Sequence, residues 1–365
     1  MKKIKKLFRT PGIFFRDYFN KKYPKVFNEI KCPKEEEATL INHDFIKEAK
    51  SICNFPVDVV FTWVDNSDPA WVAKKQKHLE ESLSERALYS TDDARFSNHD
   101  ELKYSVRSIL KNIKWVRNIF IVTDNQVPTW HDKTSKRIIF IDHKDIINEK
   151  FLPTFNSHVI EAHLHLINGL SENFIYFNDD VFVAREINVG HFFKSKDISS
   201  LFLSEKSLKL MRQRGVHTPT LQASTFSCEL LRKKYFCEID TPLVHTYVPL
   251  KKSCFEKAWE IYPEEINSFL HSKFRGNNDL NLATFLVPWL SYLEGKSVIE
   301  RDICYYFNIR STASRKFYNE LLTCNKNELM PHSFCANDFT SETNKMPHYK
   351  EALQKTLSEI YPSCY

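Results

Sequence analysis

Glycine is scarce in this sequence, with 6 residues in a chain of 365. The chain contains no G-x-G-x-x-G and no G-x-x-x-x-G-K, the glycine-rich turns that hold phosphates in Rossmann and P-loop proteins. These two classes of nucleotide site are therefore excluded. The low glycine content also excludes collagen-like segments.

Paired cysteines and long apolar runs are missing as well. The 9 cysteines are scattered singly, without a C-x-x-C motif. An odd number of isolated cysteines favours free thiols in a reducing cytosol over disulfides or a zinc knuckle. No apolar stretch is long enough to span a bilayer, and the charged start of the chain does not resemble a secretory signal. We therefore expect a cytoplasmic protein.

What the sequence does contain is a large apolar fraction and an uneven distribution of charge. Hydrophobic residues make up 42% and aromatic residues 14% of the chain, enough for a sizeable core. The net charge is +6, and basic residues interleave with aromatic ones over residues 1–31. We expect two short amphipathic helices there, attached to an anionic membrane surface. The alternatives are packing on the main domain and docking of a protein partner.

Four apolar runs each end in an aspartate: VDVVFTWVD (57–65), NIFIVTDN (118–125), RIIFIDHKD (137–145) and FIYFNDD (174–180). Continuous apolar runs are typical of strands covered on both faces, as in a parallel sheet. Helical patterns at 100–113 and 158–167 lie between them. The alternation predicts an α/β fold with a mostly parallel sheet and flanking helices. Ligands of such sheets bind beyond the carboxyl ends of the strands.

Asp179 and Asp180 are the most informative of these strand-end acids. They are surrounded by apolar and aromatic residues in FIYFNDDVFV. Burying a charge is costly unless it is paired or bound to a cation. We therefore predict that these two carboxylates hold Mg²⁺ (or Mn²⁺), since hard cations take carboxylate oxygens. One of the two can instead act as a base.

Polar side chains in three further stretches are candidate ligands of a phosphorylated substrate. Arg95 and Arg107 can hold phosphates, and a surface salt bridge is the alternative for Arg107. Asn98, Asp100 and Glu101 lie at or near a predicted helix start, and helix capping is the alternative for Asp100 and Glu101. His158 and Glu161 share a helical face, and His245, Arg275 and Asp279 follow in a region that favours helices.

These stretches together resemble the Stealth family of sugar-phosphate transferases. The resemblance rests on DVVFTWVDNSD (58–68), on residues 95–130, on LPTFNSHVIEAHLHLINGLSENFIYFNDDVFV (152–183) and, less closely, on 245–290 and CANDF (335–339). It implies a GT-A-like nucleotide-sugar fold with Asp179, Asp180, His245 and Arg275 as catalytic residues. The substrate-binding residues it implies are Trp63, Asp65, Arg95, Asn98, Asp100, Glu101, Arg107, Asn156, Ser157, His158, Glu161, Asn178 and Asp279.

The resemblance also implies a reaction and its partners. A UDP-sugar would donate its sugar-1-phosphate to a hydroxyl of an oligosaccharide or lipid-linked glycan, with release of UMP. The product would be a phosphodiester linkage in a capsular or related surface polysaccharide. The alternatives are an ordinary glycosyltransferase that releases UDP and a non-catalytic carbohydrate-binding subunit. Capsule assembly proteins and the inner face of the bacterial membrane are expected partners, and nucleic acid is not.

The expected domain organisation follows the same order along the chain. It comprises a basic amphipathic segment (1–31), a linker (32–54), an α/β nucleotide-sugar-binding core (55–195), a helical lobe that completes the active site (196–340) and a C-terminal tail (341–365). A short helix is predicted in the tail, at 349–360.

Overall fold

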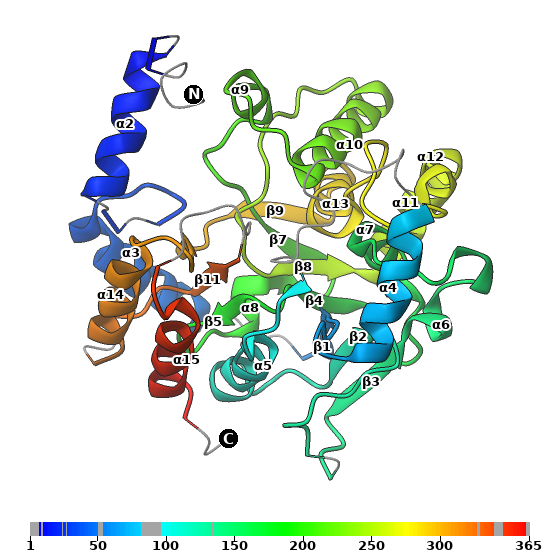
Figure 1. Cartoon of the computed structure of the whole chain (residues 1–365), viewed down its shortest axis with the longest axis horizontal. Coiled ribbons are helices and arrows are strands. Elements are labelled where there is room, and N and C mark those ends of the chain that lie inside the picture. The colour runs from blue at the N-terminus through cyan, green and yellow to red at the C-terminus, as the bar shows by residue number, and fades with distance from the viewer. Residues whose placement is uncertain are drawn as a thin grey trace.

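The structure is a computed structural model, drawn in Figure 1. It describes residues 7–8, 10–23, 25–26, 28–49, 54–81, 96–132, 134–326, 329–338 and 346–362. None of the helices in these ranges is long and apolar enough to cross a membrane. The cysteines it describes are all free thiols, as expected.

A five-stranded sheet of order β3-β2-β1-β4-β8 forms the centre of the fold. The first four strands are parallel to their neighbours, and β8 is antiparallel to β4. The strand bounds are Val57–Thr62 for β1, Ile119–Thr123 for β2, Ile138–Asp142 for β3, Asn173–Phe177 for β4 and Val248–Lys251 for β8. The four predicted strands and the mostly parallel α/β fold are therefore confirmed.

The two faces of this sheet pack against different helices. One face contacts the predicted amphipathic helix α5 (Glu101–Asn112), whose Leu102, Val106 and Ile109 are buried with the sheet residues Val59 and Ile121. The other face lies in a core with α7, α10, α11, α12 and α13. Their bounds are Ser157–Ala162, Pro219–Tyr235, Lys252–Ile261, Pro263–Phe269 and Val287–Leu293. Short elements between these are α6 (His143–Ile146), η2 (Glu149–Phe151), η3 (Leu164–Leu166) and α9 (Leu208–Gln213).

The region after residue 195 contains strands as well as the helices that the sequence predicts. These strands pair with the earlier strands β5 and β6 in two small sheets of order β10-β11-β5 and β6-β7-β9. Their strands are β5 (Val181–Val183), β6 (Phe193–Ser195), β7 (Ile198–Phe202), β9 (Ser297–Glu300), β10 (Cys304–Asn308) and β11 (Ser333–Asn337). Helix α8 (Val189–Phe192) precedes β6, and the π-helix η4 (Leu282–Leu286) runs into α13. Strand β5 pairs with β11, more than 150 residues later, and only this long-range pairing makes such short segments strands.

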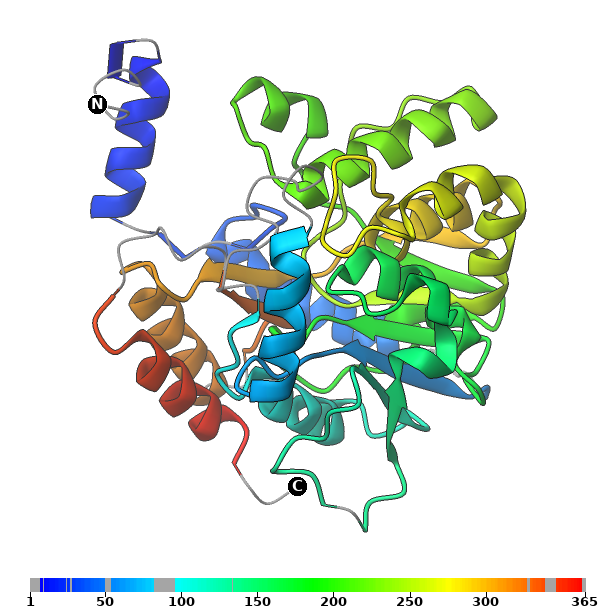
Figure 2. The same ribbon diagram turned by 45° about the vertical axis from the view of Figure 1, so that its right-hand side comes forward.

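The N-terminal helix α2 (Pro11–Lys22) stands away from the body of the molecule (Figures 1 and 2). The expected linker contains helix α3 (Lys34–Ala49), so that interpretation of its local structure was wrong. The acidic residues Glu35, Glu36 and Glu37 occupy its first turn, where the helix dipole favours them. Buried contacts hold α3 to the body, since Glu37 accepts from Asn28 Nδ2 at 2.6 Å and from the hydroxyl of Tyr305.

The C-terminal tail packs on the small sheet β10-β11-β5. Its helix α15 (Tyr349–Ile360) has the bounds that the sequence predicts. Leu353 and Leu357 are buried against α14 (Ser314–Lys326) and strand β11. Helix α4 (Pro69–Glu81) completes the fold and contributes Trp71 to the wall of the central cavity.

Candidate active site

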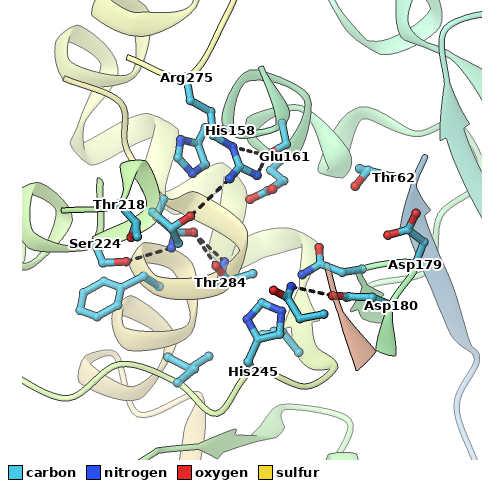
Figure 3. A pocket seen from close by; sticks show the side chains of 18 of the residues that line it. Thr62, His158, Glu161, Asp179, Asp180, Thr218, Ser224, His245, Arg275 and Thr284 are labelled. Carbon is cyan, nitrogen blue, oxygen red and sulfur yellow. Dashed lines mark hydrogen bonds between the residues drawn. The ribbon is translucent and has the colours of Figure 1, made fainter. Parts of the chain in front are cut away.

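A cavity of about 590 Å³ opens beyond the carboxyl ends of β1 and β4. Its volume is in the range typical of small-molecule and cofactor sites. Figure 3 shows Asp179 and Asp180 on the right, Thr218 and Ser224 on the left, Thr284 nearer the centre, Arg275 at the top and His245 at the bottom. The cavity therefore lies at the strand ends where the parallel sheet predicts a ligand.

The Asp179–Asp180 pair occupies the turn that joins β4 to β5. Strand β11 holds Asp180, whose Oδ2 accepts from Asn337 Nδ2 at 2.8 Å and from Cys335 Sγ at 3.3 Å. The buried Oδ1 of Asp180 has no hydrogen-bond partner among the described residues. Burial and the neighbouring charge of Asp180 raise the pKa of Asp179 to about 7. Both features indicate carboxylates that lack a positive partner within the protein.

Glu101 adds a third acid to this group from the start of helix α5. Its side chain is buried, and its Oε2 accepts from the backbone N–H of His99 at 2.5 Å. Burial, and then the charge of Asp179, raise the pKa of Glu101 well above its ordinary value. The charges of Asp179 and Asp180 both oppose that of Glu101, and a divalent cation near the unpartnered Asp180 Oδ1 would remove part of this cost.

The raised pKa of Asp179 predicts a pH-dependent stability. In the unfolded chain this carboxyl titrates near 3.8 and in the folded chain near 7, so between these values the folded state binds more protons. The free energy of unfolding therefore falls as the pH rises through this window. We expect Asp179→Asn to flatten the decline by up to about 1.4 kcal/mol per pH unit, measured by urea unfolding at pH 5, 6 and 7 without added metal. Identical slopes for the variant and the wild type would contradict this.

His245 lies beside Asp180, although 65 residues separate them in the sequence. One ring nitrogen of His245, a carboxylate oxygen of Asp180 and Cys335 Sγ all lie within 4.8 Å of one another. The ring packs edge-on against Tyr306, with centroids 5.4 Å apart. Its Nε2 is buried and has no hydrogen-bond partner in the described part of the chain. The described part of the chain therefore leaves this nitrogen without a hydrogen-bonding group of its own.

Arg275 and His158 line the same cavity from another wall. The Nε of Arg275 donates to Ser157 Oγ at 3.1 Å, and its Nη1 lies 3.4 Å from Thr220 Oγ1. His158 Nδ1 lies 2.9 Å from Asp279 Oδ2. The buried carboxylate of Asp279 thereby orients the imidazole of His158, with Nε2 on the other side of the ring. This wall thus presents a guanidinium and an oriented histidine to a ligand.

The structure brings ten of the predicted site residues together around the cavity: Trp63, Glu101, Ser157, His158, Glu161, Asn178, Asp179, Asp180, His245 and Arg275. Two others, Asn156 and Asp279, contact this wall without lining the cavity. Asn156 caps α7 and donates to Asp279 Oδ2 at 2.9 Å. Arg95 lies outside the described residues.

Four predicted site residues do not line the cavity. Asp65 Oδ1 accepts from the backbone N–H and hydroxyl of Ser67 and so closes the turn after β1. Asn98 Oδ1 accepts from Asp100 N at 3.0 Å, at the start of α5. Arg107 lies over the ring of Tyr104 and contacts the carbonyl of Tyr361 on the side of the C-terminal helix. Asp100 stands at the N-cap of α5 without a side-chain cap hydrogen bond, and Arg107 makes a ring contact in place of the surface salt bridge that was the alternative for it.

Several polar residues that line the cavity are not among the site residues predicted from the sequence. They are Thr218, Thr220, Ser224, Asn281, Thr284 and Asn337. Isolated serine, threonine and asparagine residues are common in helices and turns, so none carries a signal of its own. Only the pairing of β11 with β5 and the packing of α10 on the π-helix bring them to the cavity.

The fold and the cavity define an enzyme of the α/β class, with acids, an arginine and histidines converging at the carboxyl ends of a mostly parallel sheet. Residues 55–82 match the model of Stealth protein conserved region 1, and residues 95–201 match conserved region 2. A capsular polysaccharide phosphotransferase of Aeromonas hydrophila is 54% identical over 98% of this chain and 100% of its own. One of Actinobacillus pleuropneumoniae is 53% identical over 99% and 98%.

The chain belongs to the Stealth family and is a phosphotransferase, as the resemblance implies. Among solved structures it is similar to a galactosyltransferase, LgtC, in complex with donor and acceptor sugar analogues, with a TM-score of 0.40 and 10% identity. That match covers 83% of this chain and 95% of the other.

Proposed function

We propose that this protein transfers a sugar-1-phosphate from a UDP-sugar to a hydroxyl of a glycan acceptor and releases UMP. The product is a phosphodiester linkage in a capsular or related surface polysaccharide. One observation carries the proposal: acids, an unpartnered histidine nitrogen and an arginine face one cavity. Relatives that are more than 50% identical over nearly the whole chain and are named capsular polysaccharide phosphotransferases support a capsular polysaccharide as the product.

The bonds of this reaction assign roles to the residues. The acceptor oxygen attacks the phosphorus next to the sugar, and the bond from that phosphorus to the oxygen of the leaving UMP breaks. The sugar–oxygen bond at the anomeric carbon stays intact. Charge on the transferred phosphate needs positive groups held in place, and Arg275 supplies a guanidinium. Its contacts to Ser157 and Thr220 fix its orientation.

His245 is our assignment for the proton acceptor. A base must lie within hydrogen-bonding reach of the hydroxyl, and an imidazole titrates near neutral pH. His245 Nε2 is unpartnered, whereas Asp180 Oδ2 already accepts from Asn337 and Cys335. Asp180 remains the alternative candidate for the base, because its Oδ1 has no hydrogen-bond partner among the described residues.

Glu101, Asp179 and Asp180 would hold a Mg²⁺ or Mn²⁺ ion. The ion would neutralise charge on the diphosphate of the donor. The chain's own contribution is a set of acids whose burial and mutual repulsion raise the pKa of Asp179 and Glu101 in the absence of a cation.

The nucleotide product tests the proposed reaction. Purified protein is incubated with a UDP-sugar and oligosaccharide from the source strain's capsule, and the products are separated by anion-exchange chromatography. We expect UMP in a one-to-one ratio with a new phosphodiester, detected by ³¹P NMR. UDP as the stoichiometric product would overturn the proposal and leave an ordinary glycosyltransferase.

Removal of divalent cations is expected to stop transfer. Excess EDTA should abolish UMP release, and added Mg²⁺ or Mn²⁺ should restore it. A reading independent of activity is the melting temperature: Mg²⁺ with UDP should raise it in the wild type and raise it less in Asp180→Asn. Full transfer in excess EDTA would remove the cation from the proposed site.

Helix α2 supports attachment to a membrane surface or to capsule assembly proteins. It exposes aromatic side chains along with its basic ones: Phe15, Tyr18 and Phe19 are each about half exposed. Such a combination of aromatic and basic groups suits the interface of an anionic bilayer. We place the protein at the inner face of the bacterial membrane on this basis.

Deleting residues 1–22 is expected to weaken binding to anionic vesicles and to leave transfer to a soluble oligosaccharide intact. The deletion must stop before Asn28 and Glu29, which are part of the body: Asn28 is buried, and Glu29 N donates to the carbonyl of Cys304. Vesicle sedimentation at low and high salt measures the binding, since charge attraction to lipid is screened. Equal sedimentation of both proteins would refute the role of this segment.

A further inference from the structure

Helix α10 and the π-helix η4 form a wall of the cavity that carries no charge of its own. The lining residues that these two helices contribute are Thr220, Leu221, Ser224, Thr284 and Phe285. Figure 3 shows Ser224 on the left, Thr284 nearer the centre, and Asp179 and Asp180 on the right. A substrate whose phosphate lies between Arg275 and the acids therefore extends a neutral part toward this wall.

Asn281 connects Ser224 to Thr284 and sets the direction of their hydrogen bonds. It is 2% exposed, and its Nδ2 donates to Ser224 Oγ at 3.0 Å. Its Oδ1 accepts from the hydroxyl of Thr284 at 2.7 Å and from the backbone N–H of Thr284. Both hydroxyl groups are thus held by one buried amide.

This arrangement leaves Ser224 able to donate a hydrogen bond to a ligand and Thr284 able to accept one. Ser224 Oγ is engaged as an acceptor, and its proton has no acceptor among the described residues. Thr284 has committed its proton to Asn281, so its oxygen keeps a lone pair. Thr218 Oγ1 accepts from Leu221 N at 3.2 Å and also keeps its proton. A group that both accepts and donates, such as a sugar hydroxyl, matches this pattern, whereas phosphate oxygens only accept.

Apolar side chains beside these hydroxyls fit the remainder of a sugar ring. Leu221 and Phe285 are lining residues of the same two helices, and Met211 and Val216 also line the cavity. Pyranose rings present C–H groups between their hydroxyls, and binding sites commonly combine apolar contacts with a few fixed polar groups.

We propose that the α10–η4 wall binds a pyranose ring of a substrate and that Ser224 and Thr284 select the sugar. The inference rests on the proposed function for the identity of the substrates. The ring is that of the donor or of the acceptor, and the two sources are separated by which Michaelis constant changes. Selection follows because a hydroxyl of the wrong configuration leaves a buried polar group of the site unpaired.

The test compares Ser224→Ala, Thr284→Val and the double variant with the wild type. Each single change removes one hydrogen-bonding group with little change in volume, and we expect about a tenfold rise in KM for one substrate with a smaller change in kcat. Thr225→Val is the matched control, because Thr225 lies on α10 outside the cavity and donates to the carbonyl of Leu221. It should leave both Michaelis constants unchanged. Melting temperatures show that each variant is folded.

Binding of UDP alone, measured by isothermal titration calorimetry, separates sugar recognition from nucleotide recognition. We expect equal UDP affinity in the wild type, Ser224→Ala and Thr284→Val. Equal loss of UDP affinity would overturn the proposal and assign the wall to the nucleotide. Unchanged Michaelis constants for both substrates in the folded double variant would overturn it as well. Release of UDP in place of UMP would refute the proposed function but would not affect the assignment of the wall to a sugar ring.

Discussion

Replacing Asp179 or Asp180 by asparagine is expected to lower turnover by about a hundredfold or more, the scale seen when one electrostatic group of a transition state is lost. The substitution keeps the volume of the side chain and removes its charge. The loss follows from weaker binding of the cation and poorer placement of the diphosphate. UMP release at saturating substrate measures it.

The substitution Asp179→Asn should not destabilise the fold. Asp179 has its pKa raised to about 7 because burial and Asp180 both oppose its charge, so removing that charge relieves an unfavourable interaction. We expect the melting temperature of Asp179→Asn to equal or exceed that of the wild type when no metal is added. A large loss of activity in a fully stable variant would separate chemistry from packing.

Asp124→Asn is the matched control for this pair. Asp124 also follows a strand of the parallel sheet, but it pairs with Lys74 at 2.7 Å and lies outside the cavity. Partly exposed ion pairs contribute at most about 1 kcal/mol, so this variant should keep its transfer rate. Near-normal transfer by folded Asp179→Asn and Asp180→Asn would reject the assignment of both acids.

His245→Ala is expected to lower kcat by about a hundredfold or more and to change affinity for the UDP-sugar by no more than a few-fold. A base acts on the acceptor hydroxyl in the transition state and contributes little to binding of the donor in the ground state. The wild-type pH profile should show an ionisation that is missing from the variant. Pre-steady-state measurement of UMP formation, with calorimetric titration of the donor, separates the two quantities.

Added imidazole provides a second measurement for His245. The alanine variant leaves space beside Tyr306 and Asp180, and a free imidazole can take the place of the lost ring. We expect it to restore part of the activity of His245→Ala and to have no effect on Asp180→Asn. If folded His245→Ala transfers at the normal rate, Asp180 becomes the preferred base.

Local sequence pattern was enough for the central framework of the fold. Strands β1 to β4, helix α5 and helix α15 each have an apolar periodicity that is complete within one short window. Strand ends could be located for the same reason, and parallel strands end at one edge of the sheet. The strand-end pair Asp179–Asp180 is the clearest example, because adjacent carboxylates among buried aromatic residues are costly in any fold.

The sequence pattern was least reliable where an element depends on distant partners. Helix α3 has a polar surface and a start rich in glutamate, which indicated a linker, but Asp44 pairs with Arg301 and Ile41 is buried on the body. Strand β5 has three residues, and β11 pairs with it in antiparallel register. Short segments of this kind take their conformation from packing, which no local window contains.

The sequence by itself therefore determined a mostly parallel sheet, the helices beside it and the acids at its carboxyl edge, because apolar periodicity and the cost of a buried charge are local properties. Only the tertiary structure decided that Arg107 faces away from the cavity and that Ser224 meets Thr284 through Asn281, whereas the family resemblance already implied that His245 and Asp180 share a site. Apart from the local contact of Asn281 with Thr284, these contacts join residues from 57 to more than 250 positions apart. They form because the elements that carry these residues bury their apolar faces against one another. The local pattern does not predict these contacts, because many loop paths between the elements are compatible with it.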